Sequence, residues 1–278
     1  MLTLSQLYVY PIKSLGGIAL DRAEVTDRGL AHDRRYMLVD PAGNFLTIRQ
    51  HPRMTLLQPQ LTETGLRVAP RHAPDDVLEL PHGQYADRQR EVVIWNNRVG
   101  ARPVSAAADA WFSRQLGLGC SLVYMPDASY RPITPSSGLR PAGPTSFADA
   151  YPFLLIGEAS LADLNERIDD AQHYDMLRIR PNLVLRGGAP YVEDTLTAFQ
   201  IGAIRFTGVE PCARCGVPTV DPTTAEEHPA RQPLATLAKY RRTNRRINFG
   251  MNLIHAGRGE LKVGDTIKVE DLWSEHER

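Results

Sequence analysis

The chain has 278 residues, and its 32 Lys and Arg balance its 32 Asp and Glu, so the formal net charge is zero. No overall field therefore draws it towards nucleic acid or an anionic membrane surface. We expect no membrane span, because no run of about 18 apolar residues occurs, and no cleavable signal in residues 1–10. Three cysteines are too few for a disulfide framework and suit a reducing compartment, which predicts a cytoplasmic protein.

The first hundred or so residues predict a succession of short β-strands. They are rich in Val, Ile, Leu, Tyr and Thr and are broken by Gly, Pro, Asn and Asp at the spacing of hairpins. Such a succession indicates a barrel or a meander. The predicted strands cover residues 4–11, 19–26, 36–40, 45–48, 54–57, 65–68, 77–80 and 91–95.

A helix and a linker follow these strands. Ser105 can cap a helix over residues 106–116, which places Trp111 and Phe112 on adjoining apolar faces. Five prolines between residues 125 and 146 prevent regular structure and suit a loop between two lobes. We therefore predict two domains, 1–120 and 121–278.

The second domain mixes strands and helices, so the predicted class is α+β and rich in β-structure. Ser160 and Asp163 form a capping-box pattern for a helix that ends at Ile168, and Pro233 can open a second helix. The Gly264-Asp265 turn predicts a closing hairpin. Further strands are predicted over residues 153–156, 182–185, 203–207, 247–254 and 261–269.

The most specific local feature is Cys212-Ala-Arg-Cys215. A structural zinc site needs four ligands, and the remaining Cys120 leaves that set incomplete. A thioredoxin-like pair needs a helix after its first cysteine, and the prolines at 218 and 222 argue against one. Two interpretations stay open: two buried small side chains, or one thiolate that binds a soft metal.

Several basic residues lie next to predicted strands and could bind phosphate. Lys13 and Ser14 offer an ammonium and a hydroxyl, while Arg34 and Arg180 offer guanidinium groups. Each is also common at a solvated surface. Residues 239–246 carry five Lys or Arg in eight positions, a run that suits phosphate, RNA or an acidic protein as well as a solvated helix end.

Together, these motifs in this order resemble the MOSC superfamily, and within it the amidoxime reducing components and their bacterial relatives. The resemblance extends over nearly the whole chain, which makes it more specific than any single motif. The matching pieces are Leu7-Tyr-Val-Tyr-Pro-Ile-Lys-Ser14, Asp33-Arg-Arg-Tyr-Met-Leu-Val39, Thr47-Ile-Arg-Gln50, Pro152-Phe-Leu-Leu-Ile156, Glu158-Ala-Ser-Leu-Ala-Asp-Leu-Asn165, Arg180-Pro-Asn182, Cys212-Ala-Arg-Cys215, Thr219-Val-Asp-Pro222 and Asn248-Phe-Gly250.

This resemblance implies a β-barrel MOSC domain packed on an N-terminal β-barrel-like domain. It implies that a molybdenum cofactor (molybdopterin) lies between the lobes, with Cys215 as the thiolate ligand of the metal and Cys212 in a supporting position. The cofactor-binding residues that it implies are Lys13, Ser14, Arg34, Arg180 and Asn182. The chemistry agrees with the residue types, since cations and a hydroxyl suit a phosphate.

The resemblance also implies an oxidoreductase that reduces N-hydroxylated compounds such as amidoximes and hydroxylamines. The chain lacks the cysteines for an iron–sulfur cluster of its own, so we expect a separate ferredoxin-like or cytochrome-like carrier with a reductase. Asp149-Ala-Tyr151, Ala213 and Met251-Asn252 depart from the pattern of the animal members and affect the expected substrate pocket. The alternatives are a protein that carries the cofactor or sulfur without turnover, and a zinc-stabilised interaction protein.

Overall fold

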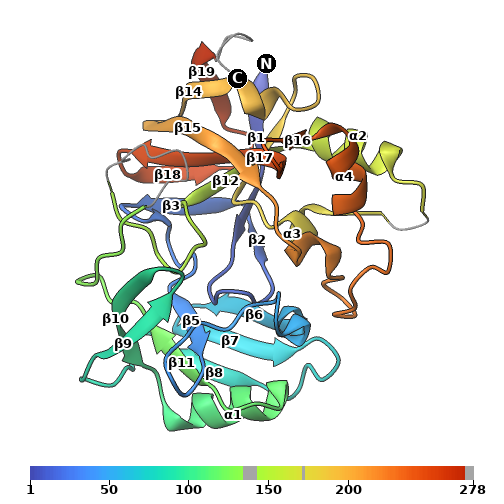
Figure 1. The fold of residues 1–278 in the computed structure, drawn as a ribbon. Helices are drawn as coiled ribbons and strands as arrows, with labels where there is room; N and C mark the ends of the chain where they lie inside the picture. The colour runs from blue at the N-terminus through green and yellow to red at the C-terminus, as the bar shows by residue number, and fades with distance from the viewer. Residues whose placement is uncertain (134–142, 171–172, 273–278) are drawn as a thin grey trace.

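The computed structural model describes residues 1–133, 143–170 and 173–272. Figure 1 shows a β-rich molecule with two lobes, an upper one built on a barrel and a lower one built on two smaller sheets. The expected α+β, β-rich class is confirmed. Residues 134–142 of the predicted linker lie outside the described residues.

The upper lobe is a closed barrel of seven strands. The sheet closes because β12 pairs with β13 on one side and with β17 on the other. In order around the barrel, the strands are β12 (Phe153–Gly157), β13 (Leu183–Arg186), β1 (Leu2–Val9), β19 (Thr266–Leu272), β14 (Leu196–Ile201), β15 (Ile204–Ala213) and β17 (Arg246–Ala256). The N-terminal strand therefore completes a barrel that is otherwise made from the second half of the chain.

Alternating side chains fill the barrel with apolar residues. Leu4, Leu7 and Val9 of β1 are buried, as are residues of every other barrel strand. Gly250 of β17 allows close approach to β12: its φ is 87°, and a Cβ atom there would lie 2.2 Å from the Cδ1 atom of Ile156. A larger residue would therefore push these two strands apart.

Shorter strands extend the barrel at its edges. β2 (Ile18–Leu20) pairs with β1, and β16 (Arg242–Thr243) forms a hairpin with β17. A separate three-stranded sheet joins distant parts of the chain, with the order β18 (Gly259–Lys262), β3 (Arg22–Thr26) and β4 (Gly29–Leu30).

The lower lobe contains two antiparallel sheets and α1 (Ala106–Leu116). Trp111 and Phe112 of α1 are buried against both sheets in one apolar cluster with the η1 (Pro52–Leu56) residue Met54. The strand orders are β5 (Tyr36–Val39), β11 (Ser121–Tyr124), β10 (Asn97–Pro103) and β9 (Arg90–Ile94) in one sheet, and β6 (Leu57–Thr62), β7 (Gly65–Pro70) and β8 (Leu78–Pro81) in the other.

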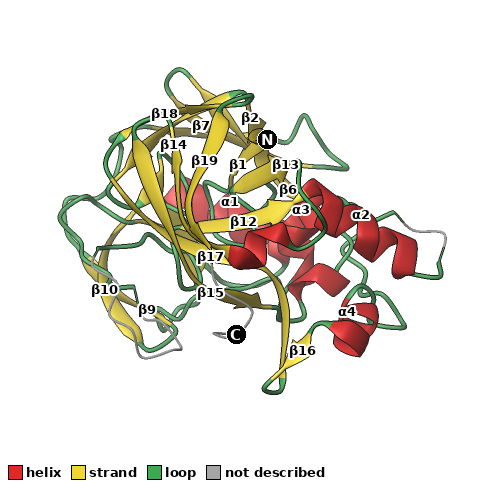
Figure 2. Cartoon of the chain, turned by 90° about the horizontal axis from the view of Figure 1, so that it is seen from above, coloured by secondary structure: helices red, strands yellow, loops and turns green. Residues whose placement is uncertain are grey.

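Three helices cover one side of the barrel, as Figure 2 shows. They are α2 (Glu158–Arg167), α3 (Met176–Ile179) and α4 (Leu234–Tyr240), accompanied by the short turns η2 (Val192–Thr195) and η3 (Val217–Thr219). Leu161 and Leu164 of α2 and Leu237 of α4 pack with Phe249 of β17 in a common apolar cluster.

The structure confirms some predicted elements and corrects others. The helix over Ala106–Leu116 is present as predicted, and the Ser105 hydroxyl caps it by accepting the Ala108 N–H. Residues 45–48 form no extended strand, and residues 54–57 begin as the η1 turn, because Pro52 starts a turn of helix there. Ser160 does not cap α2, which begins earlier at Glu158; its hydroxyl donates instead to Glu193.

The predicted closing hairpin at the C-terminus is also wrong. Gly264-Asp265 does make the expected turn, but the strands on its two sides join different sheets. β18 pairs with β3, whereas β19 pairs with β14 and β1. Their partners lie more than two hundred residues away in β3 and β1, and these distant strands outcompete the local pairing.

The domains 1–120 and 121–278 stay a prediction. The strands are not divided between the lobes at that position, since β1 lies in the barrel with the C-terminal strands and β11 lies in the lower lobe. The chain therefore crosses between the lobes after β4 and again after β11, and the crossing segments lie where the lobes meet.

Candidate functional site between the lobes

A pocket of about 350 Å³ lies between the two lobes. Its volume is in the range of small-molecule sites. Basic side chains outnumber acidic ones in its lining, with only Asp149 and Glu210 carrying carboxylates among the lining residues that the structure describes. The basic lining residues are Lys13, Arg34, Arg49, Arg180, Arg214 and Arg246.

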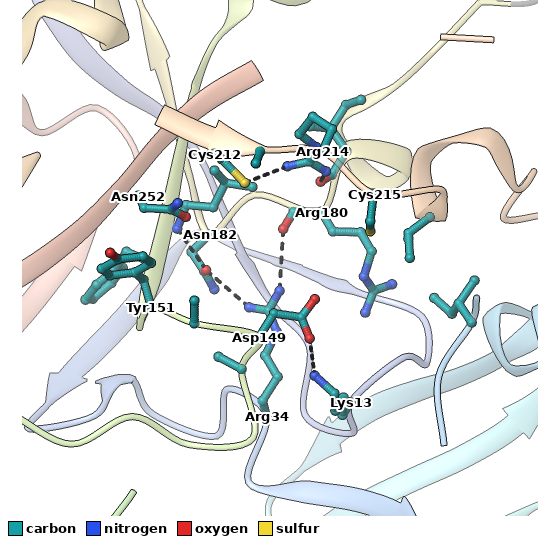
Figure 3. A pocket seen from close by; sticks show the side chains of 18 of the residues that line it. Lys13, Arg34, Asp149, Tyr151, Arg180, Asn182, Cys212, Arg214, Cys215 and Asn252 are labelled. Atoms are coloured by element: carbon teal, nitrogen blue, oxygen red, sulfur yellow. Dashed lines mark hydrogen bonds and ion pairs between the residues drawn. The ribbon is translucent and has the colours of Figure 1, made fainter. Parts of the chain in front are cut away.

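The structure brings together all six residues that the sequence predicted for the site. They line this one pocket although they are spread over about two hundred positions of the sequence. Three follow β1 or precede β5, and three follow α3 or β15 (Figure 3). The residues are Lys13, Ser14, Arg34, Arg180, Asn182 and Cys215.

Arg34 is fixed by a network of hydrogen bonds. Its guanidinium donates to both carboxylate oxygens of Asp33, at 2.9 and 2.7 Å, and to the Asn182 amide oxygen at 3.1 Å. Asn182 in turn donates to the Tyr8 carbonyl of β1. Burial raises the pKa of Asp33, although Arg34 counteracts this effect. The network joins the loop before β5 to the barrel.

The ring of Tyr10 supports two guanidinium groups of the site. The Cζ atoms of Arg34 and Arg180 each lie 4.2 Å from the centre of this ring. Tyr10 is fully buried, and its hydroxyl has no hydrogen-bond partner among the described residues. The electron-rich ring holds the two cations close together despite their mutual repulsion.

Arg180 differs from Arg34 in its partners. Within residues 1–133, 143–170 and 173–272, its guanidinium makes neither a hydrogen bond nor an ion pair. Burial lowers the pKa of Arg180 to about 10. Arg180 is half-buried, and a partly desolvated cation without an anion costs free energy, so the pocket favours an anionic ligand at this position.

Lys13 and Asp149 form an ion pair in the same pocket (Figure 3). Burial lowers the pKa of Lys13 to about 8, while the carboxylate of Asp149 opposes that shift. Burial raises the pKa of Asp149, but the charges of Lys13 and Arg49 outweigh this effect and hold it below its ordinary value. The Lys13 ammonium also donates to the Phe147 carbonyl at 3.0 Å.

The two cysteines of the motif have different surroundings. The Cys215 sulfur accepts a hydrogen bond of 3.3 Å from Arg49, whose guanidinium stacks 4.6 Å from the ring centre of Trp95. The Cys212 sulfur accepts one of 3.3 Å from Arg214. Burial raises the pKa of Cys212, only partly offset by that guanidinium. Both are free thiols, and both line the pocket.

Three of the lining residues have a left-handed backbone. The φ angles are 70° at Ser14, 49° at Arg34 and 64° at Arg180, where an L residue with a side chain is strained. Each costs about 1 kcal/mol or more and persists only where the surrounding structure fixes it. Their coincidence at one pocket indicates a functional site.

Comparison with known proteins identifies the family. The N-terminal β-barrel domain of MOSC proteins matches residues 1–118, and the MOSC domain matches residues 142–268. The human mitochondrial amidoxime reducing component 2 is 31% identical to this chain over 283 residues, which cover 95% of the chain and 82% of that protein. The chain belongs to the MOSC family.

Other MOSC proteins are similar at the same level. The molybdenum cofactor sulfurase of Solanum lycopersicum is 31% identical over 284 residues, which cover 96% of this chain but 35% of that protein. The chain thus spans about a third of the length of the sulfurase. Among solved structures, the YuaD protein of Bacillus subtilis aligns over 98% of this chain and 97% of its own, with 10% identity and a TM-score of 0.45.

Sequence reasoning missed three lining residues of this MOSC pocket: Arg49, Asp149 and Arg214. Arg49 belongs to a recognised motif, but nothing local indicates that its side chain reaches a cysteine 166 positions away. Asp149 stands out as a carboxylate among the apolar residues before β12, which was the available signal.

No helix of the described chain is long and apolar enough to cross a bilayer.

Proposed function

We propose that this MOSC protein binds a molybdenum cofactor in the pocket between its lobes and reduces N-hydroxylated compounds with it. The single observation that carries the proposal is the convergence of Cys215 with the five predicted cofactor-binding residues in one pocket. The reaction takes two electrons and two protons, cleaves the N–O bond, and releases the reduced amine or amidine and water. Bound molybdenum supplies the two-electron redox chemistry.

The residues of the pocket fit such a cofactor. Arg180 is a half-buried cation that makes no ion pair in the described part of the chain, and Arg34 is held beside it by the Tyr10 ring. Ser14 adds a hydroxyl at a strained backbone position. Paired guanidinium groups and a hydroxyl form charge-assisted hydrogen bonds with a phosphate or with the polar edge of a pterin.

The thiol of Cys215 suits a soft metal whose other ligands come with the cofactor. Its sulfur lines the pocket and accepts a hydrogen bond from Arg49, which orients it. The Cys212 sulfur is held instead by Arg214. We therefore assign the metal ligand to Cys215 and a supporting role to Cys212.

Similarity to the amidoxime-reducing components supports this choice among MOSC activities. This chain covers 82% of the length of two human amidoxime-reducing components. We infer that this chain reduces amidoximes or hydroxylamines and receives electrons from a separate carrier protein. Three free cysteines also support the proposal that it works in the cytoplasm.

The test combines metal analysis with an activity assay. Purified protein should contain molybdenum and extractable pterin, and should reduce benzamidoxime to benzamidine with a small chemical reductant. Molybdenum without reduction of any N-hydroxylated compound would instead favour a cofactor or sulfur carrier. The similarity to molybdenum cofactor sulfurase makes that carrier the second candidate. Zinc in place of molybdenum would indicate a zinc-stabilised interaction protein.

A further inference from the structure

A short hairpin of β16 and the start of β17 extends from the barrel, as Figure 2 shows. Its residue Arg246 lines the pocket. Thr243 pairs with Arg246, so Asn244 and Arg245 form a two-residue turn. Both turn residues are left-handed, with φ angles of 49° and 64°, which is the signature of a type I′ turn. This tight turn fixes the side chains at the tip relative to the barrel.

The hairpin concentrates positive charge in a chain that is neutral overall. We call its exposed basic residues, together with the last turn of α4, the basic hairpin surface: Lys239, Arg242, Arg245 and Arg246. Residues 239–246 contain no Asp or Glu. Such a cluster attracts an acidic partner and speeds encounter.

Arg241 belongs to the same sequence run but not to this surface. Its guanidinium pairs with Asp194, donates to the Asn248 carbonyl, and stacks 4.3 Å from the ring centre of Tyr191. It therefore fixes the end of α4 to the barrel. The structure separates this structural arginine from its exposed neighbours.

The basic hairpin surface is directly connected to the cysteine loop. Ala213 pairs with Asn248, and the Arg214 N–H donates to the Ile247 carbonyl at 2.8 Å. Arg246 also lines the pocket together with Cys215. A protein bound to this surface would therefore lie close to the proposed metal ligand.

We propose that the basic hairpin surface is the docking site of an acidic one-electron carrier protein, which delivers the two electrons of the reaction in two encounters. This inference rests on the proposed function. Transient redox complexes bury small interfaces and depend on charge for their rate of association. The surface suits such a partner because its basic residues are exposed and lie beside the pocket.

Single-stranded nucleic acid is a poorer match for the same charges. Its binding sites interleave cations with aromatic rings on which bases stack. Tyr240 is the aromatic residue of the run, and its ring already contacts Arg167, with the guanidinium Cζ atom 4.5 Å from the ring centre. Its hydroxyl bonds to Tyr191 at 2.8 Å. This ring is therefore committed to packing within the protein.

The test reverses two charges that do not line the pocket, Arg242→Glu with Arg245→Glu. Arg246 is kept because it lines the pocket. The matched control is Arg71→Glu with Arg258→Glu, two exposed arginines away from this surface. Arg258 follows the opposite end of β17 and lies about 30 Å from the hairpin, at roughly 3.3 Å per strand residue. Circular dichroism and thermal unfolding establish that both variants are folded.

Two reductants distinguish docking from chemistry. With a reduced, acidic plant-type ferredoxin, we expect the hairpin variant to be reduced at least about tenfold more slowly than the wild type. Its rate should also lose most of its dependence on salt between about 0.01 M and 0.1 M ionic strength. With a small chemical reductant, turnover of benzamidoxime should be unchanged. The control variant should match the wild type in both assays.

Other outcomes overturn the inference. Equal rates for the hairpin and control variants with ferredoxin would place docking elsewhere, and equal slowing with both reductants would assign these residues to the active site. A wild type that accepts electrons from the small reductant but neither binds nor is reduced by ferredoxin would exclude an acidic carrier. If the wild type reduces nothing, the proposed function fails, and titration calorimetry of ferredoxin against both variants still tests the surface separately.

Discussion

The guanidinium of Arg49 lies 3.3 Å from the sulfur of Cys215, so a side chain that follows β5 orients the thiol at the end of β15. The same guanidinium stacks on Trp95 and lies 3.7 Å from the Asp149 carboxylate. This contact joins the two lobes at the proposed metal ligand, because Arg49 belongs to the lower lobe and Cys215 follows a strand of the barrel.

Arg49→Gln should lower turnover by about tenfold or more while leaving the fold intact. A hydrogen bond from a charged donor contributes roughly 1.5–3 kcal/mol, and each 1.4 kcal/mol corresponds to about tenfold. Arg53→Gln serves as the control, since Arg53 is exposed in η1 nearby. Rates are measured with a small reductant. Equal rates in the two variants would show that the contact with Cys215 is dispensable.

Cys215→Ser should abolish activity and lower molybdenum content, because a hydroxyl is a poor substitute for a soft thiolate. Cys212→Ala should keep most of both, since its sulfur is held by Arg214 and we assign it a supporting role. Metal content and benzamidoxime reduction are measured for both proteins. If the two variants retain the same activity, the ligand assignment is wrong.

Lys13→Ala and Arg34→Ala should each lower cofactor occupancy. The loss of one charge-assisted hydrogen bond lowers the affinity for the cofactor by roughly 10- to 150-fold. Extractable pterin per mole of protein gives the occupancy. Arg35→Ala is the neighbouring control, since its guanidinium donates to the Met125 carbonyl and not into the pocket. Full occupancy in the combined Lys13 and Arg34 variant would remove both residues from the site.

Tyr10→Phe should keep cofactor occupancy and should match or exceed the stability of the wild type. The hydroxyl is buried without a hydrogen-bond partner in the described chain, so its removal relieves about 1 kcal/mol or more. Tyr10→Leu removes the ring beneath Arg34 and Arg180 and should cost about 1–3 kcal/mol and much of the occupancy. Denaturant unfolding measures the stability of both variants, and extractable pterin measures their cofactor occupancy. If the Phe variant loses as much occupancy as the Leu variant, the hydroxyl and not the ring is needed.

Lys13→Met should stabilise the protein at pH 7 by on the order of 2 kcal/mol while removing a cofactor contact. The folded-state pKa of Lys13 is about 8, below its value of about 10.4 in an unfolded chain. The unfolded state therefore binds more protons between these two values, and the stability that the site contributes rises with pH across that window. Below pH 8 the full cost of burying the charge remains.

The measurement for this prediction is the difference in unfolding free energy between variant and wild type from pH 7 to pH 10.5. The difference should shrink as the pH rises, because Lys13 becomes neutral in both states. The Asp149 carboxylate that stays behind is 55% exposed and can be hydrated. A constant difference would indicate that the ion pair with Asp149 fully offsets the burial of Lys13.

The sequence was enough to predict the helix over Ala106–Leu116 from local signals and the six pocket residues from a resemblance over the whole chain. Ser105 caps that helix with its own side chain, so the information lies within four positions. The pocket residues were found because ordered motifs over the whole chain resemble one family. Their chemical types, a thiol with three cations, a hydroxyl and an amide, are visible without coordinates.

Only the tertiary structure decided which distant segments meet. β18 and β19 flank a proper turn, yet each pairs with a strand from the start of the chain. Arg49 could equally have been a solvated cation until the lobes placed it against Cys215 and Trp95. The physical reason is that each strand pairing and side-chain contact competes with every alternative that the folded chain offers. A short segment of sequence does not show which alternatives exist.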